Sequence, residues 1–307
     1  MSTQVTLLPL SAALGLLGVL PWALGAPAHA AARTIEQMQP ADPSGTVEIV
    51  NVAGEIDVSG WDRPEVSVSG EIGDRVDRVE LSHSDHHTLV RVVLPQGIGT
   101  HFGGDGSAHL TVHVPSRSSL QVSLVSSDLK VTGVSGSQQL RTVSGDITSD
   151  GGGAATVTSA SGDVHLTVTD GSAAHVETMS GDVTLKGAGG DVSVSTVSGG
   201  GHLGLQALHS FNLRTVSGDF EIGARLERAA QFAAEAVSGE VKVDLSGTPA
   251  AEFDLHSLSG DISTCGPEKP VRPQYGPGSR LTFSTGGGGG ANVRMSSTSG
   301  DLSVCAH

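Results

Sequence analysis

A short phrase, Val-Ser-Gly-Asp or a near copy of it, recurs along most of the chain and constrains the fold more than any other feature. Between Gly145 and Gly260, successive motif glycines are separated by 17, 19, 18, 19, 21 and 21 residues. A period of about 20 residues is typical of solenoids, in which each repeat packs on its neighbours. The positions assigned to the repeated turn are Gly54, Gly145, Asp146, Gly162, Asp163, Gly181, Asp182, Gly199, Gly218, Asp219, Gly239, Gly260, Asp261, Gly300 and Asp301.

Apolar residues fall into columns when each repeat is counted from its motif glycine. The columns lie seven, five and two positions before the glycine, and two and four positions after it. Spacing by two indicates strands, because side chains alternate between faces. The three-residue step between the second and third columns predicts a corner that keeps both columns inward, so that Val143, Val197 and Val216 face the core.

The sequence therefore predicts an all-β protein, a parallel β-solenoid of roughly 20-residue coils with an N-terminal β capping region. Stacking at about 4.8 Å would let the short strands of neighbouring coils pair. The 43 glycines, and the many β-branched residues in the proposed strands, argue against helices.

Residues 1–30 have the pattern of a secretory signal peptide. An apolar stretch over residues 7–24 precedes Ala28-His29-Ala30, which fits the cleavage pattern. The first six residues lack the usual Lys or Arg, so an uncleaved membrane anchor is the alternative. Residues 31–45 are interpreted as a linker.

Residues 46–118 are predicted to form an N-terminal β region, made of a first coil around Gly54 and a cap. Val47, Ile49, Ile56 and Val58 occupy the same columns as the later repeats. Residues 119–307 are predicted to form the solenoid repeats, with a loop insertion over residues 266–290 that contains one strand. The last coil, over residues 292–305, is expected to close the stack.

Cys265 and Cys305 each lie five residues after a motif glycine and therefore share a column. In neighbouring coils, their Cα atoms would lie about 4.8–5.5 Å apart, which permits a disulfide. An intervening coil would double the separation and leave two free thiols. An even number of cysteines in an exported chain favours the disulfide.

The aspartates that follow the motif glycines form a column of like charges. They are interpreted as turn residues, because Asp stabilises turns by local hydrogen bonds. A calcium ladder is the alternative, but each coil offers one carboxylate, and Gly200 replaces one of them.

The sequence lacks the motifs of common enzymes, with no G-x-S-x-G, H-E-x-x-H or phosphate loop. No metal site and no cofactor are assigned. The net charge of −15 argues against nucleic acid as a partner, because phosphate binding needs clusters of Lys and Arg that the sequence lacks.

The column three positions before the glycine carries small hydroxyl residues and is interpreted as an outward face. A ladder of hydroxyls would offer regular hydrogen bonds to a glycan or a protein, whereas the simpler alternative is a solvated face. The residues of this candidate binding face are Thr142, Ser159, Thr178, Thr196 and Thr215.

The order of motifs resembles a bacterial family. Trp61-Asp62 followed by Val66-x-Val68, then Val114-Pro115 and the serial Val-Ser-Gly-Asp coils, are similar to the putative-adhesin, β-strand-repeat family known as domain of unknown function 4097. The resemblance covers roughly residues 46–304. It implies an exported or envelope-associated β-solenoid with adhesin-like or envelope-stress roles, and it offers no catalytic residues.

The sequence is therefore expected to encode a periplasmic or secreted, non-enzymatic, adhesin-like binding module. An envelope protein or a glycan is the expected partner, and no membrane span is expected after cleavage. The alternatives are an envelope-stress sensor that binds a signalling partner and a β-helix enzyme that acts on polysaccharides. The oligomeric state is left open.

Overall fold

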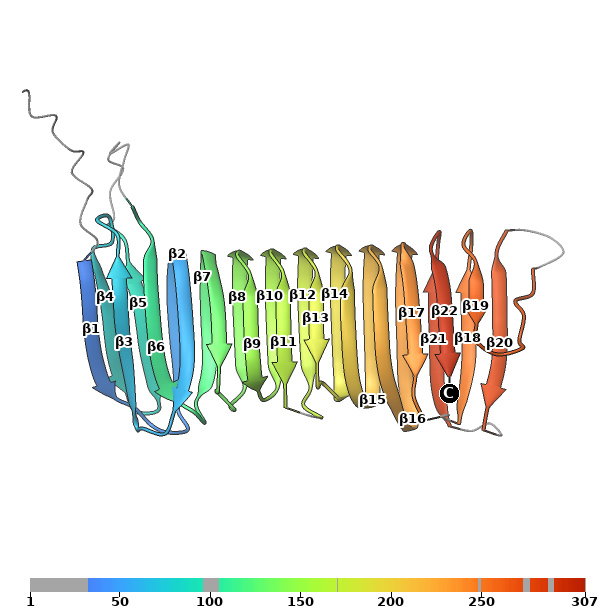
Figure 1. Ribbon diagram of the computed structural model, residues 1–307, viewed down its shortest axis with the longest axis horizontal. Helices are drawn as coiled ribbons and strands as arrows, with labels where there is room; N and C mark the ends of the chain where they lie inside the picture. The colour runs from blue at the N-terminus through green and yellow to red at the C-terminus, as the bar shows by residue number, and fades with distance from the viewer. Residues whose placement is uncertain are drawn as a thin grey trace, which may run out of the picture.

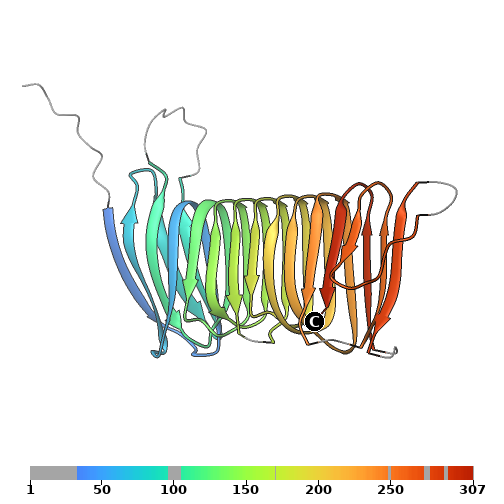
Figure 2. The ribbon, with the colours of Figure 1, turned by 45° about the vertical axis from the view of Figure 1, so that its right-hand side comes forward.

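The computed structural model describes residues 33–95, 105–169, 171–247, 250–272, 277–286 and 290–306. These residues form 22 strands and no helix, and all the strands belong to one sheet. The sheet winds into an elongated stack of coils, as Figures 1 and 2 show. The predicted all-β, mainly parallel solenoid is confirmed.

Each regular coil places strands on two opposite faces of the stack. The strands confined to the first face are β8 (Gln138–Ser144), β10 (Ala155–Ser161), β12 (Ala174–Ser180) and β14 (Gly190–Ser198). Those confined to the second face are β9 (Ile147–Gly152), β11 (Val164–Val168), β13 (Val183–Lys186) and β17 (Glu240–Leu245). Four longer strands bend from one face to the other, namely β2 (Thr46–Trp61), β7 (Ser119–Thr132), β15 (Gly201–Ser217) and β16 (Phe220–Ser238).

Corresponding columns pair in register between neighbouring coils. Val157 on β10 lies opposite Val176 on β12, which in turn lies opposite Val194 on β14. On the second face, Val164 on β11 lies opposite Val183 on β13. All of these side chains are buried, so the columns of neighbouring coils form one continuous core along the stack.

The N-terminal strands join the stack at one end. Gly54 on β2 lies opposite Ser127 on β7, in the register that the columns predict. On its other edge, β2 pairs in parallel with β5 (His87–Val93) and β6 (Ala108–Pro115). Antiparallel pairs complete this end, and they involve β1 (Arg33–Pro40), β3 (Glu65–Ile72) and β4 (Arg78–Ser84).

The linker prediction is wrong for residues 33–40, which form β1. This strand pairs antiparallel with β3 from Arg33 opposite Ile72 to Pro40 opposite Glu65. The polar composition of the segment suggested a linker. The backbone of β3 has an open edge there, however, and β1 supplies hydrogen-bond partners for that edge.

The C-terminal coils do not stack in chain order. The strands involved are β18 (Ala251–Ser257), β19 (Ile262–Thr264), β20 (Ser279–Thr285), β21 (Ala291–Ser297) and β22 (Asp301–Ala306). On the first face the spatial order is β16, β21, β18, β20, and on the second face it is β17, β22, β19 (Figure 1). The coil of β21 and β22 therefore lies between two coils that precede it in the sequence.

The expectation that residues 292–305 close the stack is accordingly wrong. The edge of β18 that faces the end of the stack is taken by β20, which pairs with it antiparallel from Ala251 opposite Thr285 to Ser257 opposite Ser279. The coil of β21 and β22 fits the same columns in either place, so its own residues do not show which neighbours it will have.

Candidate interaction surface

The predicted turn glycines lie at one corner of the stack, where the chain passes from the first face to the second. Gly181 has a φ of 116°, and a Cβ placed on it would lie 2.2 Å from the carbonyl oxygen of Gly162 in the preceding coil. A side chain there would meet both backbone strain and a steric clash. Positive φ angles recur at the corresponding positions Gly54, Gly145, Gly162, Gly199, Gly218 and Gly239.

The predicted hydroxyl face is wrong, because its side chains point into the core. Thr142, Ser159, Thr178, Thr196 and Thr215 are all buried, with exposures of 4–6%. The alternation of inward and outward side chains along the strand continues through this column without a break. The buried hydroxyl finds a partner nearby, since Oγ1 of Thr178 donates to the carbonyl oxygen of Ser180 at 3.1 Å. The same bond joins Thr142 to Ser144 and Ser159 to Ser161.

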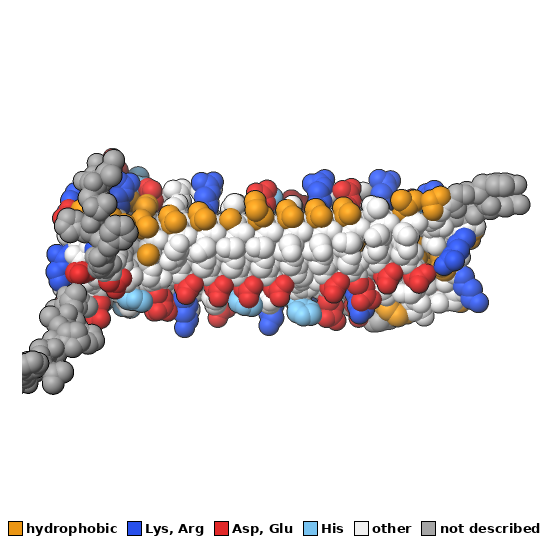
Figure 3. Space-filling view, turned by 90° about the horizontal axis from the view of Figure 1, so that it is seen from above, with side chains coloured by type: hydrophobic (Ala, Val, Ile, Leu, Met, Phe, Trp, Pro, Cys, Tyr) orange, Lys and Arg blue, Asp and Glu red, His pale blue; other side chains and the backbone are white. Residues whose placement is uncertain are grey.

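The apolar column two positions before the glycine is the exposed one, which reverses the sequence prediction. Seven of its large members are between 42% and 61% exposed, and we call them the apolar ridge: Val125, Val143, Met179, Val197, Val216, Val237 and Leu258. Figure 3 shows exposed apolar side chains in a straight row along the stack. Ala160 and Thr298 occupy the same column in two further coils, and Val52, in the coil of Gly54, is half-buried. Contiguous exposed apolar surface of this kind marks interaction sites.

A row of carboxylates runs parallel to the apolar ridge, three positions further along each coil (Figure 3). Six of these carboxylates accept a hydrogen bond from the next coil. The N–H of Asp163, for example, donates to Oδ1 of Asp146, and the N–H of Asp182 donates to Oδ1 of Asp163, both at 2.8 Å. These bonds support the turn interpretation, with the difference that the bonded N–H belongs to the neighbouring turn. We call the row the acidic ladder; its members are Asp128, Asp146, Asp163, Asp182, Asp219, Glu240, Asp301 and Asp261.

The ridge and the ladder make this corner amphipathic. Between them lie the serines and glycines of the turns, whose small side chains leave the band low and flat (Figure 3). Carboxylates on neighbouring coils repel each other, and nearby cations would relieve this repulsion. The corner is therefore suited to contact with an elongated surface that combines apolar and cationic groups.

The outer surfaces of the two faces carry charges of both signs in pairs. Arg214 and Glu235 lie 3.5 Å apart on neighbouring strands of the first face, and Lys242 and Glu240 lie 3.0 Å apart on the second. A hydrogen bond to the Glu240 carboxylate raises the pKa of Lys242. These exposed pairs neutralise part of the charge on the two faces.

A hollow of about 430 Å³ lies on the first face over β16, β21, β18 and β20. Its lining includes Glu235, His256, Arg280 and Arg294. Arg280 is held in place by two hydrogen bonds to Asp254, at 2.9 and 2.8 Å, and these bonds raise the pKa of Arg280. Glu235 of the lining is paired with Arg214, and the side chains of Glu235, Asp254 and Arg280 are all exposed.

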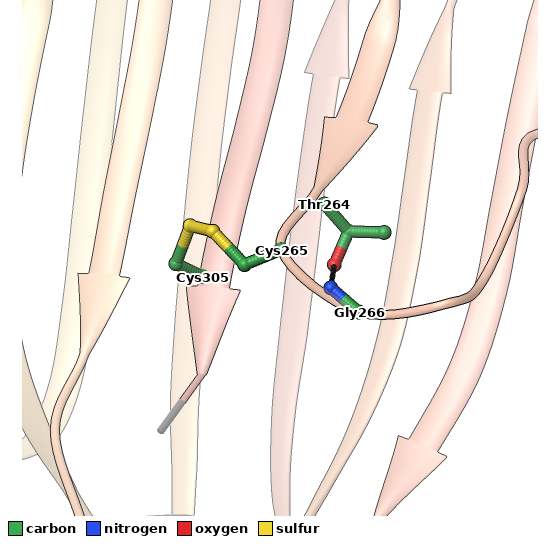
Figure 4. The surroundings of a disulfide bond; sticks show 4 residues. All are labelled: Thr264, Cys265, Gly266 and Cys305. Carbon is green, nitrogen blue, oxygen red and sulfur yellow. Dashed lines mark hydrogen bonds between the residues drawn. A yellow bond between two sulfur atoms is a disulfide. The ribbon is translucent and has the colours of Figure 1, made fainter.

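Cys265 and Cys305 form the predicted disulfide (Figure 4). Their Cα atoms lie 5.0 Å apart, because the coils of β19 and β22 are neighbours. The N–H of Gly266 donates to Oγ1 of Thr264 at 3.1 Å just beyond Cys265. The disulfide joins the end of β22 to the segment that follows β19.

Within the described part of the chain, no group of three or more His, Cys, Asp or Glu side chains is placed to hold a metal ion. None of the described residues forms a helix long and apolar enough to cross a membrane. The predicted signal peptide, residues 1–30, lies outside the described residues.

The fold and this corner define a class of protein: an all-β solenoid of stacked parallel coils with a regular, exposed amphipathic edge. The chain belongs to the Toastrack DUF4097 family, whose model matches residues 75–305. No curated protein sequence matches the chain.

Solved structures with some likeness to this protein come from species of Clostridium, Bacteroides and Parabacteroides. A putative cell adhesion protein from Clostridium sporogenes is 9% identical, with coverage of 89% of this chain and 99% of that one, at a TM-score of 0.23. A putative adhesin from Bacteroides fragilis is 11% identical, with coverage of 89% of this chain and 97% of that one, at a TM-score of 0.39. A putative adhesin from Parabacteroides distasonis is 10% identical, with coverage of 89% of this chain and 98% of that one, at a TM-score of 0.27. No functional conclusion follows from these likenesses.

Proposed function

We propose that this protein is an exported, non-enzymatic binding module of the cell envelope that holds a protein partner along its amphipathic corner. The observation that carries the proposal is the apolar ridge, in which seven large apolar side chains stay about half exposed in a straight row. A soluble protein gains nothing in stability from exposing such a row, so binding is the better explanation.

The chemistry of the corner favours a protein partner over a glycan. The hydroxyl column that suggested glycan binding is buried, and four of its five hydroxyls donate to a carbonyl oxygen two residues further along the same chain. The exposed rows are apolar and acidic, which suits a segment with apolar side chains on one side and Lys or Arg on the other. Association with the acidic ladder would be fast and sensitive to salt.

Export is supported by the signal-like residues 1–30 and by the disulfide, since stable disulfides are typical of oxidising compartments. The intact mass of the protein isolated from the envelope fraction tests this part of the proposal. We expect a chain that begins at Ala31. A chain that retains residues 1–30 would contradict cleavage and export.

Site-specific photo-crosslinking in intact cells tests the binding face. A photo-reactive phenylalanine analogue replaces Val197 on the ridge or, as the control, the exposed Lys130 on the second face. We expect one dominant protease-sensitive adduct from position 197. It should be absent from position 130, and it should be lost at high salt or when Val216→Ser and Val237→Ser are added.

Equal adducts from both positions, or none from position 197, would show that the ridge is not a binding face. An adduct removed by glycosidases but not by proteases would contradict a protein partner and would indicate that the ridge binds a glycan.

A further inference from the structure

The coil formed by β21 and β22 is inserted between two coils that the chain has already completed. Phe232 on β16 lies opposite Val293 on β21, and Val293 lies opposite Phe253 on β18. On the second face, Val241 on β17 pairs with Leu302 on β22, which pairs with Ile262 on β19. The other two coils therefore form the two walls of a slot, and the C-terminal coil fills it.

The corner hydrogen bonds give the same stacking order independently. Along the regular stack, the carboxylates of Asp128, Asp146, Asp163, Asp182 and Asp219 each accept from an N–H of the next coil away from the N-terminal end. At the C-terminal end, Oδ1 of Asp301 accepts from the N–H of Asp261 at 2.8 Å. The residue later in the sequence therefore takes the earlier place in the stack, as insertion requires.

The inserted coil is part of the core and not an appendage. Its inward side chains are buried to within 1% of full burial: Ala291, Val293, Met295, Leu302 and Val304. Its backbone pairs on both edges, with β16 and β17 on one side and with β18 and β19 on the other. An empty slot would expose apolar surface together with four unpaired strand edges, those of β16, β17, β18 and β19.

The inserted coil pairs with β16, β17, β18 and β19. A second copy of the chain has the same four strands and could accept the coil in the same register. In the sequence, five glycines at residues 286–290 connect it to β20. This short connection, and the disulfide from Cys305 to Cys265, are what assign the coil to its own slot. Exchange of an identical element between copies keeps the native contacts and is a low-cost route to a dimer.

We propose that the slot is a strand-acceptor site whose alternative occupant is the β21–β22 coil of a second copy, and that the Cys265–Cys305 disulfide locks the coil in its own chain. Before the disulfide forms, a high protein concentration favours exchange. At low concentration the tether keeps the coil local, through its high effective concentration. This proposal rests on the stacking order and is independent of the binding function proposed for the corner.

Two full-length variants test the exchange. Cys265→Ser keeps only Cys305, on the inserted coil, whereas Cys305→Ser keeps only Cys265, on the slot. The variants are unfolded together, refolded as a mixture and treated with oxidised glutathione. Two protein thiols form one disulfide, two electrons reduce the glutathione disulfide to two glutathione thiols, and the protons of the protein thiols pass to these products.

When a Cys265→Ser coil occupies a Cys305→Ser slot, the two remaining cysteines become neighbours. We expect a disulfide-linked heterodimer on non-reducing gels, at least about tenfold in excess over either homodimer, because only the exchanged pair is held in bonding geometry. Random collision of exposed thiols would instead give both homodimers alongside the heterodimer, and this result would overturn the proposal.

Two controls keep the outcome interpretable. Variants refolded separately and then mixed should give little heterodimer, since a filled slot opens slowly. Light scattering on the variant with both cysteines replaced should show dimers that increase with protein concentration during refolding. A strictly monomeric double variant with native circular dichroism would also overturn the proposal.

Discussion

The regular coils from β7 to β17 and the C-terminal coils from β18 to β22 share one cross-section but relate chain order to stacking order differently. In the regular part, each coil lies on its predecessor, and a Cβ on Gly239 would meet the carbonyl oxygen of Gly218. At the C-terminal end, Gly300 lies in this way on Gly239, and Gly260 lies on Gly300. The repeated turn therefore determines the shape of a coil and leaves its neighbours undetermined.

The choice of neighbours at the C-terminal end depends on contacts outside the repeat. β20 pairs with one edge of β18, so β21 is left with the opposite edge, facing β16. The aromatic ring of Phe283 on β20 stacks on that of Phe253, with centroids 4.4 Å apart, and strengthens this terminal pair. One antiparallel strand that breaks the repeat thus decides where a regular coil is placed.

The largest expected effect is the disruption of the regular stack by Gly181→Val. The substitution forces a β-branched residue to a φ of 116° and places its Cβ 2.2 Å from the Gly162 oxygen. We expect a loss of more than about 3 kcal/mol in the free energy of unfolding, measured by denaturant titration. Gly223→Val is the matched control, because a Cβ at Gly223 meets no atom within 4 Å. Equal midpoints for the two variants would contradict the corner geometry.

Removal of the disulfide should lower the local stability of the C-terminal coils and leave that of the regular coils unchanged. Cys265 and Cys305 are 40 residues apart in the sequence, and closing a loop of that length stabilises a protein by up to about 4 kcal/mol. With both cysteines replaced by serine, we expect faster amide hydrogen exchange in β21 and β22 and unchanged exchange in β8 to β13. Uniformly faster exchange would indicate that the two regions unfold as one unit.

A smaller difference should distinguish intact from interrupted positions of the acidic ladder. Asp163→Ala removes a carboxylate that accepts the N–H of Asp182, and we expect a cost of about 1–2 kcal/mol. At Glu240 the ladder changes, because the N–H of Asp301 donates to the carbonyl oxygen of Gly239. Glu240→Ala should therefore cost less than about 0.5 kcal/mol. Similar losses at both positions, in thermal unfolding, would argue against a role of these bonds in stacking.

The smallest expected effect belongs to the apolar ridge. Val197 is 49% exposed, so Val197→Ser should change the free energy of unfolding by less than about 0.5 kcal/mol. Val194→Ser, three residues earlier and fully buried, should cost several times more because it introduces a hydroxyl into the core. Equal costs in denaturant titration would reverse the assignment of inward and outward side chains.

Much of the coil could be predicted from the sequence, because its columns and turn depend on local chemistry. The alignment of Gly54 with Ser127, and the pairing of Cys265 with Cys305, follow from counting positions alone. The candidate surface could not be predicted in this way. Threonine and valine have nearly the same shape, so hydrophobicity assigned Val197 to the core and Thr196 to the surface.

The signal that was missed is the unbroken alternation from Val192 through Val194 to Thr196, all of which are buried. A threonine in the core is tolerated there because the chain turns directly after it and brings a carbonyl oxygen within reach, as Ser180 does for Thr178. The position of β21 could not be predicted for a different reason. The columns of β18 and β21 are equivalent, and only the pairing of β20 with β18 distinguishes them.

The place of Ala306 determines how the molecule would carry tension. This residue ends β22 on the flank of the stack, while the coil of β18 and β19 and strand β20 lie beyond it (Figure 1). A pull on Ala306 would act across the long axis and would tend to peel β22 away one hydrogen bond at a time. Cys305 is the adjacent residue, so the force would reach the covalent link to Cys265 before the rest of β22 separated. The disulfide therefore holds the end of β22 under a force that would otherwise break its hydrogen bonds one after another.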